Sequence, residues 1–133
     1  MIVVDTHVLA WADFDERRLG RKARGLLDRF WKSGQVAVCA LSFWEAALLQ
    51  GRGRLALPAA PDEWRRQLLA GGLLELAVDG DAAIRAAGLG AMSNDPVDRL
   101  IVATALEHGA ELMTADERLL RWEHPLVRHD ARG

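Results

Sequence analysis

The chain has 133 residues, half of them hydrophobic, and a formal net charge of −2. This length suits one compact domain with its own core and is too short for two ordinary domains. No apolar stretch approaches the length of a membrane span, which argues against a membrane protein, and the net charge neither favours nor excludes nucleic acid as a partner.

The chain opens with a predicted strand, IVV, at residues 2–4. This strand directly follows Met1, without a charged or apolar leader, so we expect a cytoplasmic protein. A short helix is expected over residues 6–12. A second helix is predicted over residues 20–32, where apolar side chains recur at helical spacing, and Gly34 ends it.

The second predicted helix and the residues before it are strongly basic. Between residues 17 and 32, one acid, Asp28, stands among the basic residues Arg17, Arg18, Arg21, Lys22, Arg24, Arg29 and Lys32. A helix with this balance can contact a phosphate backbone, but a solvated outer face explains the pattern at least as well. The basic stretch is therefore compatible with nucleic acid without requiring it.

Strand-like and helix-like segments alternate through the rest of the chain. The apolar run VAVCAL at 36–41 is typical of a strand buried on both faces, and it makes Cys39 a small buried side chain rather than a disulfide partner or metal ligand. Further strands are predicted at 73–78, 111–114 and, weakly, 126–128. Helices are predicted at 43–49, 62–70 with Asp62 as N-cap, 81–89, 97–108 and 116–121.

Strands that alternate with helices imply right-handed crossovers and parallel pairing. We therefore predict an α/β fold, a three-layer α/β/α sandwich with a mainly parallel central sheet, in which residues 1–133 form one domain.

Four acids lie just after predicted strands or near the starts of the following helices. They are Asp5 after the strand 2–4, Glu45 in the first turn after the strand 36–41, Asp116 after the strand 111–114, and Asp98 in the first turn of the helix 97–108. Ligands of open parallel sheets bind outside the carboxyl ends of the strands. At least three of these carboxylates should emerge at that edge, and the fourth can reach it.

Helix capping offers a local explanation for each acid. Ser42 and Glu45 have the spacing of a capping box, in which each side chain bonds a free backbone N–H. Asp95 before Pro96 is typical of an N-cap, and Asp98 is favoured there by the helix dipole. Capping explains an acid at one helix start, but not why several starts on one sheet edge carry one.

A cluster of four carboxylates predicts a bound cation. Two like charges about 4 Å apart repel by about 4 kcal/mol at an effective dielectric constant of about 20, so the cluster is unfavourable alone. Because the donors are oxygen atoms, and no His or Cys has ligand spacing, Mg²⁺ or Mn²⁺ fits better than zinc.

The same residues resemble the PIN-domain ribonucleases, and most closely the VapC-type toxins of bacterial and archaeal toxin–antitoxin pairs. The matching motifs, in order, are Asp5-Thr6, Ser42-x-x-Glu45, Asp95-Pro-Val-Asp98-Arg99 and Leu112-Met-Thr-Ala-Asp116. The resemblance runs from Met1 to about Arg128. Ser93 and Val97 stand where that subgroup often has His and Phe, a departure that bears on substrate preference and leaves the acids intact.

The resemblance implies a metal-dependent endoribonuclease that hydrolyses RNA phosphodiester bonds as the toxin of a toxin–antitoxin pair. Asp5 and Asp98 would be the principal metal ligands, with Asp116 a further ligand. Glu45 would bind the metal through water or orient the attacking water. The implied partners are an RNA substrate, a cognate antitoxin protein and a second copy of the chain in a homodimer.

Several neighbours of the acids are candidates for supporting contacts, namely Thr6, Ser42, Thr114 and Arg99. The hydroxyls suit hydrogen bonds to carboxylates but also suit capping, and the arginine suits a carboxylate, a phosphate or a structural ion pair. Trp11 and Trp44 lie on helices that leave the predicted site, where an indole stacks on a base or packs in the core or a dimer surface. A non-catalytic RNA- or protein-binding module on the same fold remains the alternative.

Overall fold

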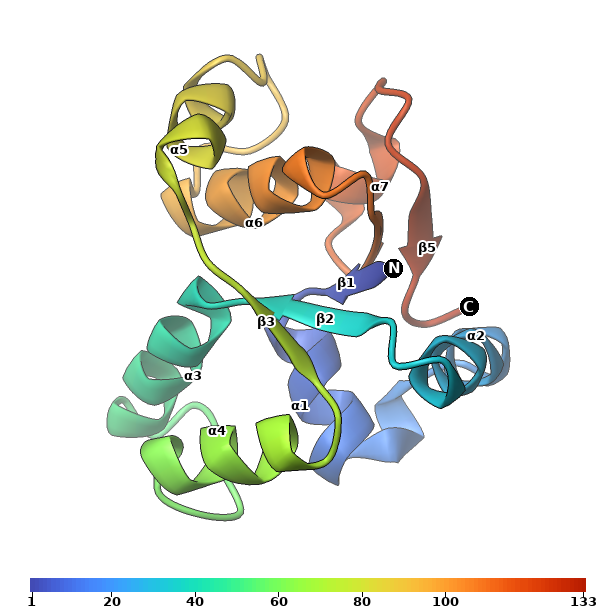
Figure 1. Cartoon of the computed structure of the whole chain (residues 1–133), viewed down its shortest axis with the longest axis vertical. Helices are drawn as coiled ribbons and strands as arrows, with labels where there is room; N and C mark the ends of the chain where they lie inside the picture. Colours follow the sequence, from blue (N-terminus) through green and yellow to red (C-terminus); the bar gives the residue numbers. More distant parts are fainter.

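A computed structural model describes residues 1–133, and its centre is one sheet of five parallel strands in the order β3-β2-β1-β4-β5 (Figure 1). The strands are β1 (Ile2–Val4), β2 (Val36–Cys39), β3 (Leu74–Leu76), β4 (Glu111–Thr114) and β5 (Arg128–Asp130). The central strand β1 pairs with β2 on one side and β4 on the other, so successive connections diverge at its carboxyl end. Ligands bind at such a switch point in open α/β sheets.

Helices cover both faces of this sheet. They are α1 (Thr6–Phe14), α2 (Arg21–Lys32), α3 (Leu41–Gly51), α4 (Pro61–Ala70), α5 (Gly80–Ala87), α6 (Pro96–Glu107) and α7 (Glu117–Arg121), with a 3₁₀ turn η1 (Glu16–Arg18) after α1. Figure 1 shows α1 to α4 on one side of the sheet and α5 to α7 on the other. The predicted three-layer α/β/α sandwich is confirmed.

Alternating residues of β1 pack into two separate hydrophobic cores, one on each face of the sheet. Ile2 and Val4 are buried with Val8 of α1 on the first side, whereas Val3 is buried with Ile101 of α6 on the second. This two-residue period is what a strand with both faces covered requires. The N-terminal strand is thus fixed from both sides, and so is the residue that follows it.

Two predicted caps are wrong because each helix begins earlier than its sequence signal. Helix α3 begins at Leu41, straight after β2, so Ser42 lies inside the helix and forms no capping box; the N-cap, Ala40, makes no side-chain bond. Helix α4 begins at Pro61, whose fixed φ suits the first helical position. Asp62 is therefore inside α4, where it pairs with Arg66.

The remaining differences are small. The last strand lies at Arg128–Asp130 rather than at 126–128, since its residues RHD are polar and carry no apolar signal. None of the helices is long and apolar enough to cross a membrane.

Candidate active site

Asp5 lies at the carboxyl end of the central strand. Its backbone N–H donates to the carbonyl of Met113 in β4 at 3.0 Å, which continues the sheet ladder by one residue. One side-chain oxygen, Oδ1, accepts from the N–H of Thr6 at 2.8 Å, and the other, Oδ2, accepts from the hydroxyl of Thr114 at 2.8 Å. Burial raises the pKa of Asp5 above its usual value, against the lowering effect of these two bonds.

Asp98 is the least solvent-exposed of the four acids. It lies in the first turn of α6 and is 8% exposed. Its Oδ2 accepts from the hydroxyl of Ser93 at 3.0 Å. Burial, followed by the negative charges of Asp5 and Asp95, raises the pKa of Asp98 to about 7.

Asp116 follows β4 and caps α7. Its Oδ1 accepts from the N–H of Arg118 at 2.9 Å, and its own N–H donates to the hydroxyl of Thr114 at 3.1 Å. Thr114 therefore joins Asp5 and Asp116 at the carboxyl ends of the neighbouring strands β1 and β4. Burial raises the pKa of Asp116, but the hydrogen bonds and charge of Arg118 outweigh this and hold the pKa below its usual value.

Glu45 reaches the same region from α3. Because α3 begins at Leu41, Glu45 lies beyond the first turn and not within it, as the sequence had suggested. Its side chain is half-buried, and burial raises its pKa, to which the negative charge of Asp5 adds. The hydroxyl of Thr6 donates to the buried hydroxyl of Ser42 at 2.9 Å, which ties α1 to α3 beside these acids.

The acids form one electrostatic cluster. The charge of Asp5 raises the pKa of Glu45 and of Asp98, and the charge of Asp116 raises the pKa of Asp5 and of Asp98. Asp5 thus interacts electrostatically with each of the other three acids, which come from α3, α6 and the β4–α7 turn.

This donor set fits a hard divalent cation. The donors are oxygen atoms, and a cation would offset the burial and the negative charge that together raise the pKa values of Asp5, Glu45 and Asp98. No group of three or more Asp, Glu, His or Cys side chains converges closely enough to hold a metal ion by itself. Magnesium requires no such cage, because it takes one or two carboxylates and keeps several waters.

The other predicted neighbours have distinct positions. Asp95 caps α6, with Oδ1 accepting from the N–H of Val97 at 2.9 Å, as its place before Pro96 predicted. Arg99 contacts no carboxylate: its guanidinium donates to the backbone carbonyls of Ala86, Gly90 and Ser93. Arg99 thus holds the loop before α6, including the residue that bonds Asp98.

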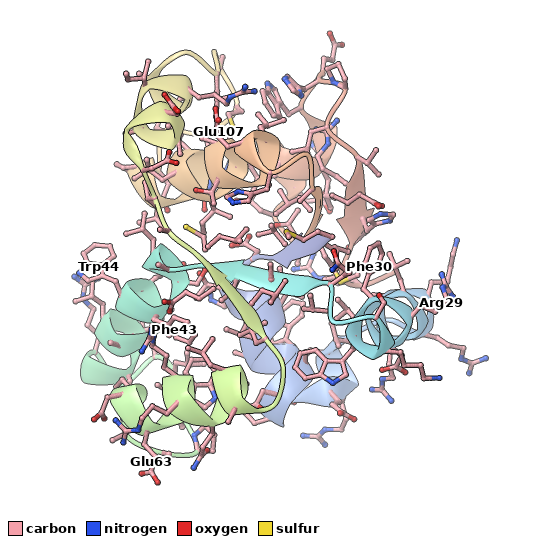
Figure 2. All side chains as sticks on the ribbon, viewed as in Figure 1. Arg29, Phe30, Phe43, Trp44, Glu63 and Glu107 are labelled. Atoms are coloured by element: carbon pink, nitrogen blue, oxygen red, sulfur yellow. The ribbon has the colours of Figure 1, made fainter.

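The two tryptophans differ in exposure. Trp44 is 54% exposed and points away from α3 on the outer side of the molecule (Figure 2). Trp11 is half-buried against the first core, and the guanidinium of Arg18 lies 6.0 Å from its ring. Trp44 therefore offers an open aromatic surface, whereas Trp11 packs within the fold.

Two residues of the site were missed by the sequence reasoning. Ser93 was noted only as a departure from a motif, although it donates to Asp98. Arg118 was not singled out, although its guanidinium lies 3.3 Å from Asp116 and 3.7 Å from Asp98. The one signal in the sequence was that Arg118 comes two residues after Asp116, the acid that follows β4.

The sequence profile of the PIN domain matches residues 2–124. Over 125 residues, 93% of each chain, this protein is 34% identical to "Ribonuclease VapC22" of Mycobacterium tuberculosis. It is also similar to "Toxin-antitoxin complex from Klebsiella pneumoniae", with a TM-score of 0.65 and 20% identity over 96% of this chain and 95% of that chain. For VapBC2 from Rickettsia felis, bound to a DNA fragment from its promoter, the TM-score is 0.70 with 16% identity over 98% of both chains. At these identities the two structures share the fold.

Proposed function

This chain belongs to the PIN-domain family, and we propose that it is a ribonuclease that acts as the toxin of a toxin–antitoxin pair. Its identity of 34% to a named ribonuclease over nearly the whole length supports the activity class. We further propose that cleavage is hydrolytic and depends on Mg²⁺ or Mn²⁺. The observation that carries this finer proposal is the geometry of the acids: Thr114 bonds both the carboxylate of Asp5 and the N–H of Asp116, and the guanidinium of Arg118 lies 3.3 Å from Asp116 and 3.7 Å from Asp98.

Each acid has a proposed role. Asp5, Asp98 and Asp116 would hold the metal ion, directly or through water. A bound divalent ion lowers the pKa of a water ligand and stabilises the negative charge that develops on the phosphate during in-line displacement. Glu45, half-buried and with a raised pKa, would orient the attacking water and accept its proton.

The hydrogen bonds around the acids support these roles. Thr114 donates to Asp5 Oδ2 at 2.8 Å and Ser93 donates to Asp98 Oδ2 at 3.0 Å, so two of the three proposed metal ligands are oriented by a hydroxyl. Fixing a ligand's rotamer in this way typically raises metal affinity, because less side-chain motion is lost on binding. The hydroxyl pair Thr6–Ser42 keeps the helix that carries Glu45 against α1.

RNA cleavage with and without metal tests the proposal. The purified chain should cut a labelled transcript with Mn²⁺ or Mg²⁺ and stop when EDTA is added. Asp98→Asn should fold, judged by circular dichroism, and fail to cut. Asp62→Asn is the matched control, since this acid lies in the first turn of α4 with a side chain 75% exposed, and it should cut normally. Equal cleavage by Asp98→Asn and wild type would contradict the assignment.

The structural relatives also support a protein partner, since they are described as toxin–antitoxin complexes, one of them bound to promoter DNA. We propose that a cognate antitoxin binds this chain and blocks its active site. We also propose that two copies of the chain form a homodimer, and that the protein acts on RNA in the cytoplasm. Co-expression with the product of a neighbouring reading frame should give a stable complex that no longer cuts RNA. A complex that retains full cleavage would contradict the antitoxin assignment.

A further inference from the structure

One positive side chain contacts two of the four acids. The guanidinium of Arg118 lies 3.3 Å from Asp116 Oδ2 and 3.7 Å from Asp98 Oδ2, both through Nη2. No other ion pair in the structure involves Asp98 or Asp116. A single cationic atom therefore lies between two carboxylates to which a metal-binding role is assigned.

The guanidinium is held loosely compared with the acids it contacts. The side chain of Arg118 is 61% exposed, whereas that of Asp98 is 11% exposed. Beside Arg118 lies an open hollow of about 580 Å³, lined also by Met92 of the loop before α6 and by Arg121 of α7. A long, exposed side chain with room beside it can leave the carboxylates without disturbing the core.

We propose that Arg118 is an internal counter-cation that competes with the divalent ion for Asp98 and Asp116, and that turns to the RNA phosphate when the ion displaces it. This inference rests on the proposed function. The charges alone require competition, because a guanidinium and a divalent ion cannot share the same two carboxylates without mutual repulsion. A displaced guanidinium at the mouth of the site meets a phosphodiester, which it recognises through paired N–H donors.

Helix α7 provides a matched control for this idea. Arg121 lines the same hollow but forms its only ion pair with Glu117, at 3.3 Å. Arg118→Gln and Arg121→Gln therefore remove the same charge from the same short helix, and only the first frees Asp98 and Asp116. A general effect of net charge would change both variants alike.

Mn²⁺ affinity, measured by titration calorimetry on the intact chain, is the direct test. On the scale of exposed ion pairs, Arg118→Gln should bind Mn²⁺ about three- to tenfold more tightly than wild type, and Arg121→Gln should match wild type. At saturating Mn²⁺, Arg118→Gln should raise the KM for RNA about five- to tenfold, and Arg118→Lys should restore part of the loss.

The outcomes separate this inference from the function on which it rests. Unchanged or weaker Mn²⁺ binding by Arg118→Gln, or equal tightening in Arg121→Gln, overturns the competition while the metal site stands. An unchanged KM for RNA overturns the phosphate contact. If Asp98→Asn binds Mn²⁺ as wild type does, the proposed metal site itself fails, and the inference fails with it.

Discussion

The starts of α6 and α7 use the same local device with opposite results. Each helix begins with an aspartate cap, Asp95 or Asp116, and each places an acid, Asp98 or Asp116 itself, near the carboxyl ends of β1 and β4. Yet the pKa of Asp98 rises to about 7, mainly through burial, whereas Arg118 lowers the pKa of Asp116. The helix start sets where an acid points, and its tertiary neighbours set its charge.

The contrast predicts different requirements for cleavage. Asp98→Asn should lower the single-turnover rate of RNA cleavage at least about 10³-fold, because a buried central ligand has no substitute. Asp116→Asn should cost only about 10- to 100-fold, since this acid is more exposed and its asparagine can hold a water in its place. Gel-based rates at saturating Mn²⁺ give both numbers. Equal losses would mean that the two acids are equivalent ligands.

The second prediction concerns the pH dependence of the stability of the metal-free chain, measured in EDTA. Asp98 titrates near 3.8 when unfolded and near 7 when folded, so protonation stabilises the fold. That stability is fully present below pH about 4 and is lost as pH rises through 7. Between pH 5 and pH 8 the free energy of unfolding should fall by about 2 to 3 kcal/mol. The raised pKa values of Asp5 and Glu45 act in the same direction.

Urea unfolding followed by tryptophan fluorescence measures this change. The Asp98→Asn variant provides the control, since it should show a flatter profile and exceed wild type in stability at pH 8. If wild type and Asp98→Asn showed the same dependence of stability on pH, a group other than Asp98 would be responsible for it. Asp116 does not disturb the measurement, because its lowered pKa confines its own contribution to pH below about 4.

Much of the fold could be predicted because its strands are buried on both faces. All of β1 and β2 is buried, and such continuous apolar runs indicate parallel strands without any alignment. The start of α3 could not be predicted, since Ala40 and Leu41 carry no capping signature. The edge strand β5 was misplaced because its polar residues carry no apolar period.

The residues of the site also fall into a group that the sequence predicted and a group that it did not. The positions of Asp5 and Asp116 follow directly from strand ends, which the sequence makes visible. The contacts of Ser93 and Arg118 with Asp98 depend on how a loop and a short helix pack beside α6, and no periodic pattern in the sequence indicates that packing. Residues placed by secondary structure were predictable, and those placed by tertiary contact were not.

A smaller effect on stability is expected from the hydroxyl of Ser93, which bonds Asp98 at the start of α6. Ser93→Ala removes the buried bond to Asp98 Oδ2 and should destabilise the chain by about 1 to 2 kcal/mol at pH 8, where Asp98 is ionised. Near pH 5 the loss of stability should be smaller, because a hydrogen bond to a neutral carboxyl is weaker than one to a carboxylate. Urea unfolding at both pH values checks this, with Ser33→Ala, an exposed hydroxyl at the end of α2, as control. A pH-independent loss would indicate packing instead.

The smallest effect should come from Asp116→Asn on the stability of the metal-free chain. Asparagine caps a helix about as well as aspartate, so the bond to the N–H of Arg118 is retained. Only the pairing with an exposed guanidinium is lost, which is worth about 0.5 kcal/mol or less. Urea unfolding at pH 8 should therefore show a slight loss for Asp116→Asn and a gain for Asp98→Asn. The same substitution then changes stability in opposite directions at two neighbouring helix starts, because Arg118 holds the pKa of Asp116 below its usual value, whereas burial raises the pKa of Asp98. A gain at both positions would mean that Arg118 does not neutralise Asp116.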